Sequence, residues 1–145
     1  MPYVNKAGFI FIIASLLLSA CNSGKSGERW YNETQVIKGK KIYLANCISC
    51  HLDKGAGSEN WKVSLEDGSY PPPPLNGKAH TWHHSTEVIT KIINEGGAPY
   101  DGHMPPFKEV LNEEEITSVI SYIQSLWSDE IYEIWKERDI ESRKN

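Results

Sequence analysis

The most regular repeat of apolar residues lies near the C-terminus and predicts two consecutive helices. Asn112 followed by Glu115 has the spacing of a capping box at a helix start. The apolar residues that follow at helical spacing are Ile116, Val119, Ile120, Ile123, Leu126 and Trp127. Ser128 and Asp129 then begin a shorter amphipathic helix, whose expected apolar face is Ile131, Ile134 and Trp135.

Two further helices are predicted upstream. One starts at Ser85 or Thr86 and ends at Gly96-Gly97, because glycine commonly follows a helix end. Its apolar stripe consists of Val88, Ile89, Ile92 and Ile93. The other is predicted to be capped by Thr34 and to run from Gln35 to about Cys47 or His51. Its apolar residues fit a helical period only loosely: Val36, Ile37, Tyr43 and Leu44.

Residues 52–76 show no helical period. Trp61, Val63 and Leu65 alternate with polar residues and Asp67-Gly68 is a hairpin turn signal, so a short β-hairpin is predicted over about 61–70. Pro71 to Pro74 must then be extended. Loops of this length are uncommon in a small domain unless they are functional or something else organises them, and a large buried cofactor would do so. The expected fold class is all-α, with three to four helices and long loops.

The N-terminal segment has the pattern of an export signal. Gly8 to Leu18 is an uncharged run that falls well short of the roughly 20 residues needed to span a bilayer as a helix. It ends in Leu18-Ser19-Ala20-Cys21, which resembles the lipobox of bacterial lipoproteins, in which the cysteine becomes the lipidated first residue. The alternatives are an ordinary signal peptide with a chance cysteine and an uncleaved anchor. All three imply an exported domain on the periplasmic side of the cell envelope.

These patterns divide the chain into a signal peptide (1–20), a flexible tether from lipidated Cys21 (21–33), a folded domain (34–127) and a C-terminal helical extension and tail (128–145). With 145 residues, the chain has room for one domain of ordinary size. Its formal net charge of −4 comes with no basic block, so nucleic acid is not an expected partner. No Ser-His-Asp set, carboxylate pair or phosphate-binding loop suggests catalysis.

The strongest chemical signal is Cys47-Ile48-Ser49-Cys50-His51, which has the C-x-x-C-H pattern of covalent haem attachment. On helical backbone both sulfurs can reach the two vinyl groups along one edge of a porphyrin. His51 lies on the same face, four residues after Cys47, and can place an imidazole nitrogen on the iron.

Three other kinds of site also use closely spaced cysteines. A structural disulfide across two residues is uncommon. A thioredoxin-like redox pair needs a βαβ context, which the sequence lacks. A zinc site needs about four cysteine or histidine ligands in spaced pairs, and a second cysteine pair is missing. One covalent haem c is therefore the expected cofactor.

Met104 is the expected sixth ligand of the haem iron. It is the only methionine besides Met1, and it lies in a loop stiffened by Pro105 and Pro106. The alternative for Met104 itself is a role as a core gap-filler. Among the competing histidines, His103 is the most credible, ahead of the other candidates: His80, His83 and His84.

These motifs together resemble a class I cytochrome c over about Thr34 to Trp127, with a bacterial lipoprotein-type member as the nearest pattern. Gly39, followed four residues later by Tyr43, matches the Gly-x-x-x-aromatic pattern of that family's first helix. The resemblance implies that Gly39 lets the last helix cross closely, with Val119 and Tyr122 at the contact. Pro73, Leu75 and Gly77 match the family's Pro-x-Leu-x-Gly turn. The resemblance implies that the carbonyl of Pro73 accepts a hydrogen bond from His51.

The segment His80 to His84 resembles a bacterial subset of monohaem cytochromes, and it makes Trp82 or one of these histidines a candidate to bind a haem propionate. The implied function is transfer of single electrons between redox proteins, such as a membrane dehydrogenase, oxidase or reductase, and not enzymatic catalysis. One alternative is an electron-entry subunit of a larger membrane oxidoreductase. The other is a haem sensor or peroxidase-like protein with an open iron.

Overall fold

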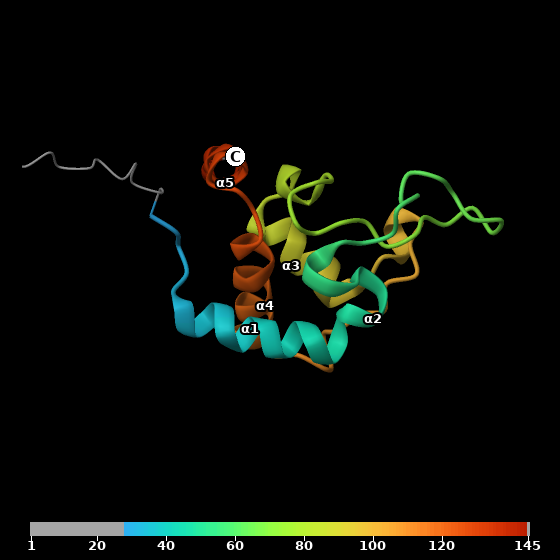
Figure 1. Ribbon diagram of the computed structural model, residues 1–145, viewed down its shortest axis with the longest axis horizontal. Coiled ribbons are helices and arrows are strands. Elements are labelled where there is room, and N and C mark those ends of the chain that lie inside the picture. The colour runs from blue at the N-terminus through green and yellow to red at the C-terminus, as the bar shows by residue number, and fades with distance from the viewer. Residues whose placement is uncertain (1–27, 145) are drawn as a thin grey trace, which may run out of the picture.

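The computed structural model describes residues 28–144, and all the regular structure within that range is helical (Figure 1). The α-helices are α1 (Glu33–Asn46), α2 (Ile48–His51), α3 (Thr86–Glu95), α4 (Glu113–Ser125) and α5 (Asp129–Ser142). Three 3-10 turns lie in the loops: η1 (Asp53–Gly55), η2 (Thr81–His83) and η3 (Ala98–Tyr100). The all-α expectation is confirmed.

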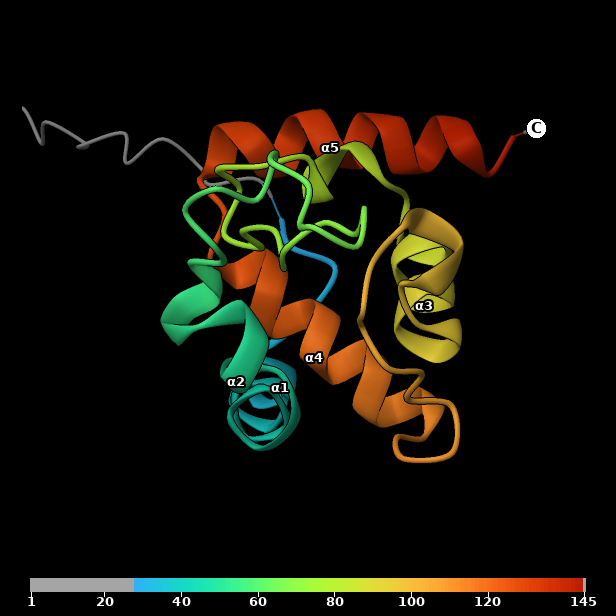
Figure 2. The ribbon, with the colours of Figure 1, turned by 90° about the vertical axis from the view of Figure 1, so that its right-hand side faces the viewer.

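Helices α1 and α4 cross at the centre of the domain and make the largest helix–helix contact of the described residues. Figure 2 views α1 end-on, with α4 running obliquely above it and α3 to one side. A Cβ built on Gly39 of α1 would lie 1.8 Å from the backbone oxygen of Ser118 and 3.0 Å from Cβ of Tyr122. The close crossing implied for Gly39 is therefore present, and Ser118 is its nearest neighbour on α4.

The helix starts follow from short-range capping. Ser85, Asn112 and Ser128 cap α3, α4 and α5 as expected, and Glu115 completes a capping box on α4. The expected cap of the first helix was wrong. Asn32, rather than Thr34, caps α1, because its side chain accepts a hydrogen bond from the amide of Gln35 while the Gln35 side chain accepts one from the amide of Asn32.

The predicted β-hairpin at 61–70 was also wrong, since residues 28–144 contain no strand. The turn itself forms: the amide of Leu65 donates to the carbonyl of Ser69 at 2.7 Å. The chain then leaves that turn, and Tyr70 pairs with Gly102 in an isolated parallel bridge. Gly102 lies in the loop that follows α3, and the residues on the two sides of the Asp67-Gly68 turn therefore do not form a paired hairpin.

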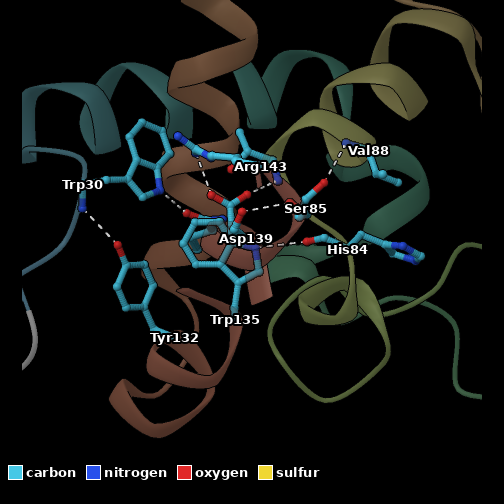
Figure 3. Close-up of polar contacts among 11 residues, drawn as sticks. Trp30, His84, Ser85, Val88, Tyr132, Trp135, Asp139 and Arg143 are labelled. Carbon is cyan, nitrogen blue, oxygen red and sulfur yellow. Dashed lines mark hydrogen bonds and ion pairs between the residues drawn. The ribbon is translucent and has the colours of Figure 1, made fainter. Parts of the chain in front are cut away.

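Helix α5 packs on the rest of the domain through a face that includes Ile131 and Trp135, as expected, but not Ile134. Its buried residues are Tyr132, Trp135 and Asp139, whereas Ile134 is 37% exposed. The Trp135 indole donates to the carbonyl of His84 at 3.0 Å. The Asp139 carboxylate accepts a hydrogen bond from the amide of Thr86 at 2.7 Å (Figure 3). The extension therefore contacts the start of α3 and belongs to the folded unit.

Part of the predicted tether is also packed against the domain. The Arg29 guanidinium pairs with Asp129 and lies over the ring of Tyr132. The Trp30 amide donates to the Tyr132 hydroxyl at 2.9 Å, and the Trp30 indole donates to Gln124 (Figure 3). The signal peptide, Cys21 and the first part of the tether lie outside the described residues. Among the described helices, none combines the length and the apolar character that crossing a membrane requires.

Candidate functional site

The haem-attachment motif forms the junction between α1 and α2. Cys47 caps the end of α1, and its carbonyl accepts hydrogen bonds from the amides of Cys50 at 3.2 Å and His51 at 2.9 Å. Among the described residues the two sulfurs form no disulfide, and Cys47 is half-buried whereas Cys50 is exposed. Burial raises the pKa of the Cys47 thiol to about 11, and the neighbouring Cys50 adds to the shift. The motif therefore has the helical turn that gathers its two sulfurs and one imidazole.

The imidazole of His51 is oriented by the proline run. Its Nδ1 lies 3.0 Å from the carbonyl oxygen of Pro73, a distance at which Nδ1–H donates a hydrogen bond. Burial lowers the pKa of His51, although the Pro73 carbonyl acts in the opposite direction. A neutral ring whose Nδ1 is engaged leaves Nε2 as the nitrogen that can ligate a metal.

Two glycines place the proline run against His51. The amide of Gly57 donates to the carbonyl of His51 at 2.9 Å, and Leu75 donates to Gly55 at 2.8 Å. Gly57 has φ +65°, and a Cβ there would lie 2.3 Å from the nitrogen of Pro74 and 2.7 Å from the oxygen of Pro73. The sequence showed no helical period over 52–76 and did not predict this contact, and the only local sign of it is the pair of glycines shortly after the haem motif, Gly55 and Gly57.

The loop carrying Met104 is attached to the end of α3. The amide of Gly97 donates to the carbonyl of Met104 at 2.9 Å, and the amide of Phe107 donates to Ile93 at 2.9 Å. A Cβ on Gly96 would lie 2.7 Å from the Met104 oxygen, so this approach requires glycine. Gly96-Gly97 therefore ends the helix and also seats the methionine loop.

Cys47 and Met104 border the same hydrophobic core, in which both are partly buried. The core is built mainly from residues of α1, α3, α4 and α5. Two cysteine thiols on one turn are the groups that attach haem covalently, and an imidazole and a thioether are both known ligands of haem iron. The residues present therefore fit haem c, for which Cys47, Cys50, His51 and Met104 are the candidate residues.

The remaining candidates have other partners. Nε2 of His103 lies 2.7 Å from a carboxylate oxygen of Asp67, and the exposed ring of His80 packs on Trp61 with centroids 5.1 Å apart. Trp82 is partly buried against the core, and the Arg138 guanidinium lies 5.2 Å from its ring centroid. Within residues 28–144, no three His, Cys, Asp or Glu side chains gather as a metal site.

The helical fold and this donor set define a covalent-haem domain of the cytochrome c class. Residues 34–123 match the family model described as cytochrome c oxidase, cbb3-type, subunit III. The chain belongs to this family. It is an electron-transfer haem protein with a class I cytochrome c domain and one covalently bound haem c.

Three curated relatives are similar to the chain. The cytochrome c subunit of the quinone alcohol dehydrogenase of Gluconobacter oxydans is 26% identical over 63% of this chain and 18% of its own length. The cbb3-type cytochrome c oxidase subunit FixP of Bradyrhizobium diazoefficiens is 30% identical over 61% of this chain and 27% of its own length. Cytochrome c6 of Leptolyngbya boryana is 32% identical over 59% of this chain and 85% of its own length. The chain thus spans less than a third of the first two relatives. No solved structure matches it.

Proposed function

We propose that the protein is a membrane-tethered carrier that passes single electrons between redox proteins of the bacterial cell envelope, through an iron ligated by His51 and Met104. The observation that carries this proposal is the site itself: two thiols and a neutral imidazole share one helical turn, and a thioether loop borders the same core. Bound haem supplies the Fe(III)/Fe(II) couple.

Each residue of the site has its own task. Cys47 and Cys50 hold the haem through the two sulfurs of one helical turn. The bond from His51 to the Pro73 carbonyl fixes the ring and raises its basicity. The soft sulfur of Met104 favours reduced iron, which raises the reduction potential relative to a site with two histidines.

The proposed tether rests on the lipobox-like sequence that ends at Cys21. A lipid on that cysteine would hold the carrier at a membrane surface. The expected partners are then membrane dehydrogenases, oxidases or reductases, and the mildly acidic chain, with net charge −4, is not suited to nucleic acid.

The optical spectrum of the ferric holoprotein tests the ligation. Wild-type protein is expected to be low-spin and to show the methionine-to-iron charge-transfer band at the red end of the visible spectrum. Met104→Ala is expected to lose that band completely, whereas His103→Gln is expected to keep it. A wild-type iron that is high-spin and binds small ligands readily would refute the carrier mechanism and favour a sensor or peroxidase-like protein.

A second candidate function is an electron-entry subunit of a larger oxidoreductase. It is favoured by two relatives, whose names describe them as subunits of an alcohol dehydrogenase and of a cytochrome c oxidase. Size analysis of the detergent-solubilised protein separates the candidates. Migration as a small single protein supports the free carrier, and co-migration with an oxidase or dehydrogenase supports the subunit.

A further inference from the structure

The segment Trp61–Tyr70 contacts the loop that carries Met104. In Figure 1 this green segment lies beside the gold turn η3, at the start of that loop. Nε2 of His103 donates to Oδ2 of Asp67 at 2.7 Å. The amide of Tyr70 donates to the carbonyl of Asp101 at 2.7 Å, and Tyr70 forms its parallel bridge with Gly102. One segment therefore holds the three residues that precede Met104.

Asp67 has two tasks in this arrangement. Its Oδ1 accepts hydrogen bonds from the amide of Ser69 at 2.9 Å and from the Ser69 hydroxyl at 2.6 Å, which closes the turn. Its Oδ2 is then free to accept from His103. The carboxylate thus fixes the shape of its own turn and also binds the methionine loop.

The methionine loop needs support on this side. Its inner edge is held by Ile93 of α3, whose carbonyl accepts from the amide of Phe107, and by Gly97 just after α3, whose amide donates to the carbonyl of Met104. Its outer part includes Asp101 in a left-handed conformation with φ +55°, which is unfavourable for most residues. Loop segments with exposed backbone hydrogen bonds are the first to open by local unfolding. Contacts from Trp61–Tyr70 oppose that opening.

We propose that Trp61–Tyr70 is a strap that keeps Met104 on the haem iron, with Asp67 as its main positioning residue. The proposal rests on the proposed ligation by Met104. The strap acts on the lifetime of the iron–sulfur bond, because a competing ligand can bind only after the methionine loop has moved away. It does not supply a ligand.

The rate at which imidazole displaces Met104 tests the strap. The ferric holoprotein is mixed with saturating imidazole, so that loop opening limits the loss of the charge-transfer band. Asp67→Ala is expected to accelerate this loss by about threefold to tenfold, as removal of an exposed ionic hydrogen bond and its turn implies. Asp67→Asn is expected to accelerate it less, because asparagine suits the same turn.

Glu66→Ala is the matched control, because it removes the neighbouring exposed carboxylate and the same charge. Its displacement rate is expected to equal that of the wild type. Equal rates in Asp67→Ala and Glu66→Ala would overturn the strap while leaving Met104 as the ligand. If Asp67→Ala fails to fold, the comparison of Asp67→Asn with Glu66→Ala decides in the same way. A wild-type protein without the charge-transfer band would overturn the ligation, and the strap with it.

Discussion

Replacing Gly39 by alanine is expected to destabilise the protein, against the usual sign of this change in a helix. In a helix interior, alanine is favoured over glycine by about 1 kcal/mol. At this position, however, a Cβ would lie 1.8 Å from the oxygen and 2.5 Å from the carbon of the Ser118 carbonyl. Non-bonded heavy atoms prefer about 3.5–4.0 Å, so α1 and α4 would have to separate by roughly 1.5 Å. Both atoms belong to backbone, and no side-chain rotation can relieve the overlap.

The expected magnitude follows from opposing terms. Overpacking costs about 1–3 kcal/mol, and a gap of about 0.5–1 Å forfeits a quarter to a half of each dispersion contact across the interface. When the gain in helix propensity is subtracted, the free energy of unfolding is expected to fall by about 2–3 kcal/mol. This corresponds to a fall in Tm of roughly 8–12 °C for a domain of this size.

Urea and thermal unfolding of the ferric holoprotein, followed by circular dichroism, measure this loss. Lys40→Ala is the matched control, because Lys40 is the exposed neighbour of Gly39 on the same helix. Its stability is expected to stay within about 0.5 kcal/mol of the wild type. A Gly39→Ala protein as stable as the wild type, or more stable, would refute the close crossing of α1 and α4.

Two other substitutions test distant contacts. Gly57→Ala is expected to push the Pro73 carbonyl off the haem-ligating histidine and to raise the reduction potential by roughly 40 mV, the one-electron equivalent of about 1 kcal/mol. Redox titration measures this, and Asn60→Ala is the control because Asn60 is an exposed, uncharged residue three positions further along the chain; equal potentials in the two variants would contradict the contact. Asp139→Ala is expected to lower the free energy of unfolding in urea by about 1–3 kcal/mol, because the partly buried amide of Thr86 loses its acceptor and the ion pair with Arg143 is lost. Exposed Glu137→Ala is expected to cost under about 0.5 kcal/mol, and equal losses would show that α5 does not depend on the carboxylate.

Sequence patterns predicted the features that depend on neighbours along the chain. Ser85, Asn112 and Ser128 cap their helices through residues within one turn, so their roles are visible in the sequence. The error at α1 was of the same short-range kind. Asn32 with Gln35 is itself a capping-box pattern and competes with Thr34, and the reciprocal side-chain bonds decide the outcome.

Contacts between distant segments were not predictable in this way. Asp67-Gly68 indicates the turn within 61–70, but the sequence around it does not indicate that Tyr70 pairs with Gly102. Similarly, nothing near Asp139 indicates that its partner is the amide of Thr86 at the start of α3. Local periodicity carries no information about such partners, because they are fixed only when the helices pack.

The candidate site likewise has a part that local sequence predicts and a part that depends on contacts between distant segments. Cys47, Cys50 and His51 share one helical turn, and their spacing alone indicates their chemistry. The position of Pro73 against His51 depends on a contact across the loop, and it came from a family resemblance rather than from local pattern. The glycine that permits this contact, Gly57, was seen in the sequence only as a loop residue.

The packing of α5 also bears on where the stable folded unit ends. The family match ends at residue 123, but Tyr132 and Trp135 of α5 are among the most buried side chains of the described residues. A fragment cut at residue 123 would keep the haem-attachment motif and lose two of the largest side chains of the core. Loss of a buried aromatic side chain costs about 3–5 kcal/mol, which is a large fraction of the stability of a small domain. The smallest piece of this protein that folds stably is therefore expected to extend through α5, beyond the segment that it shares with its family.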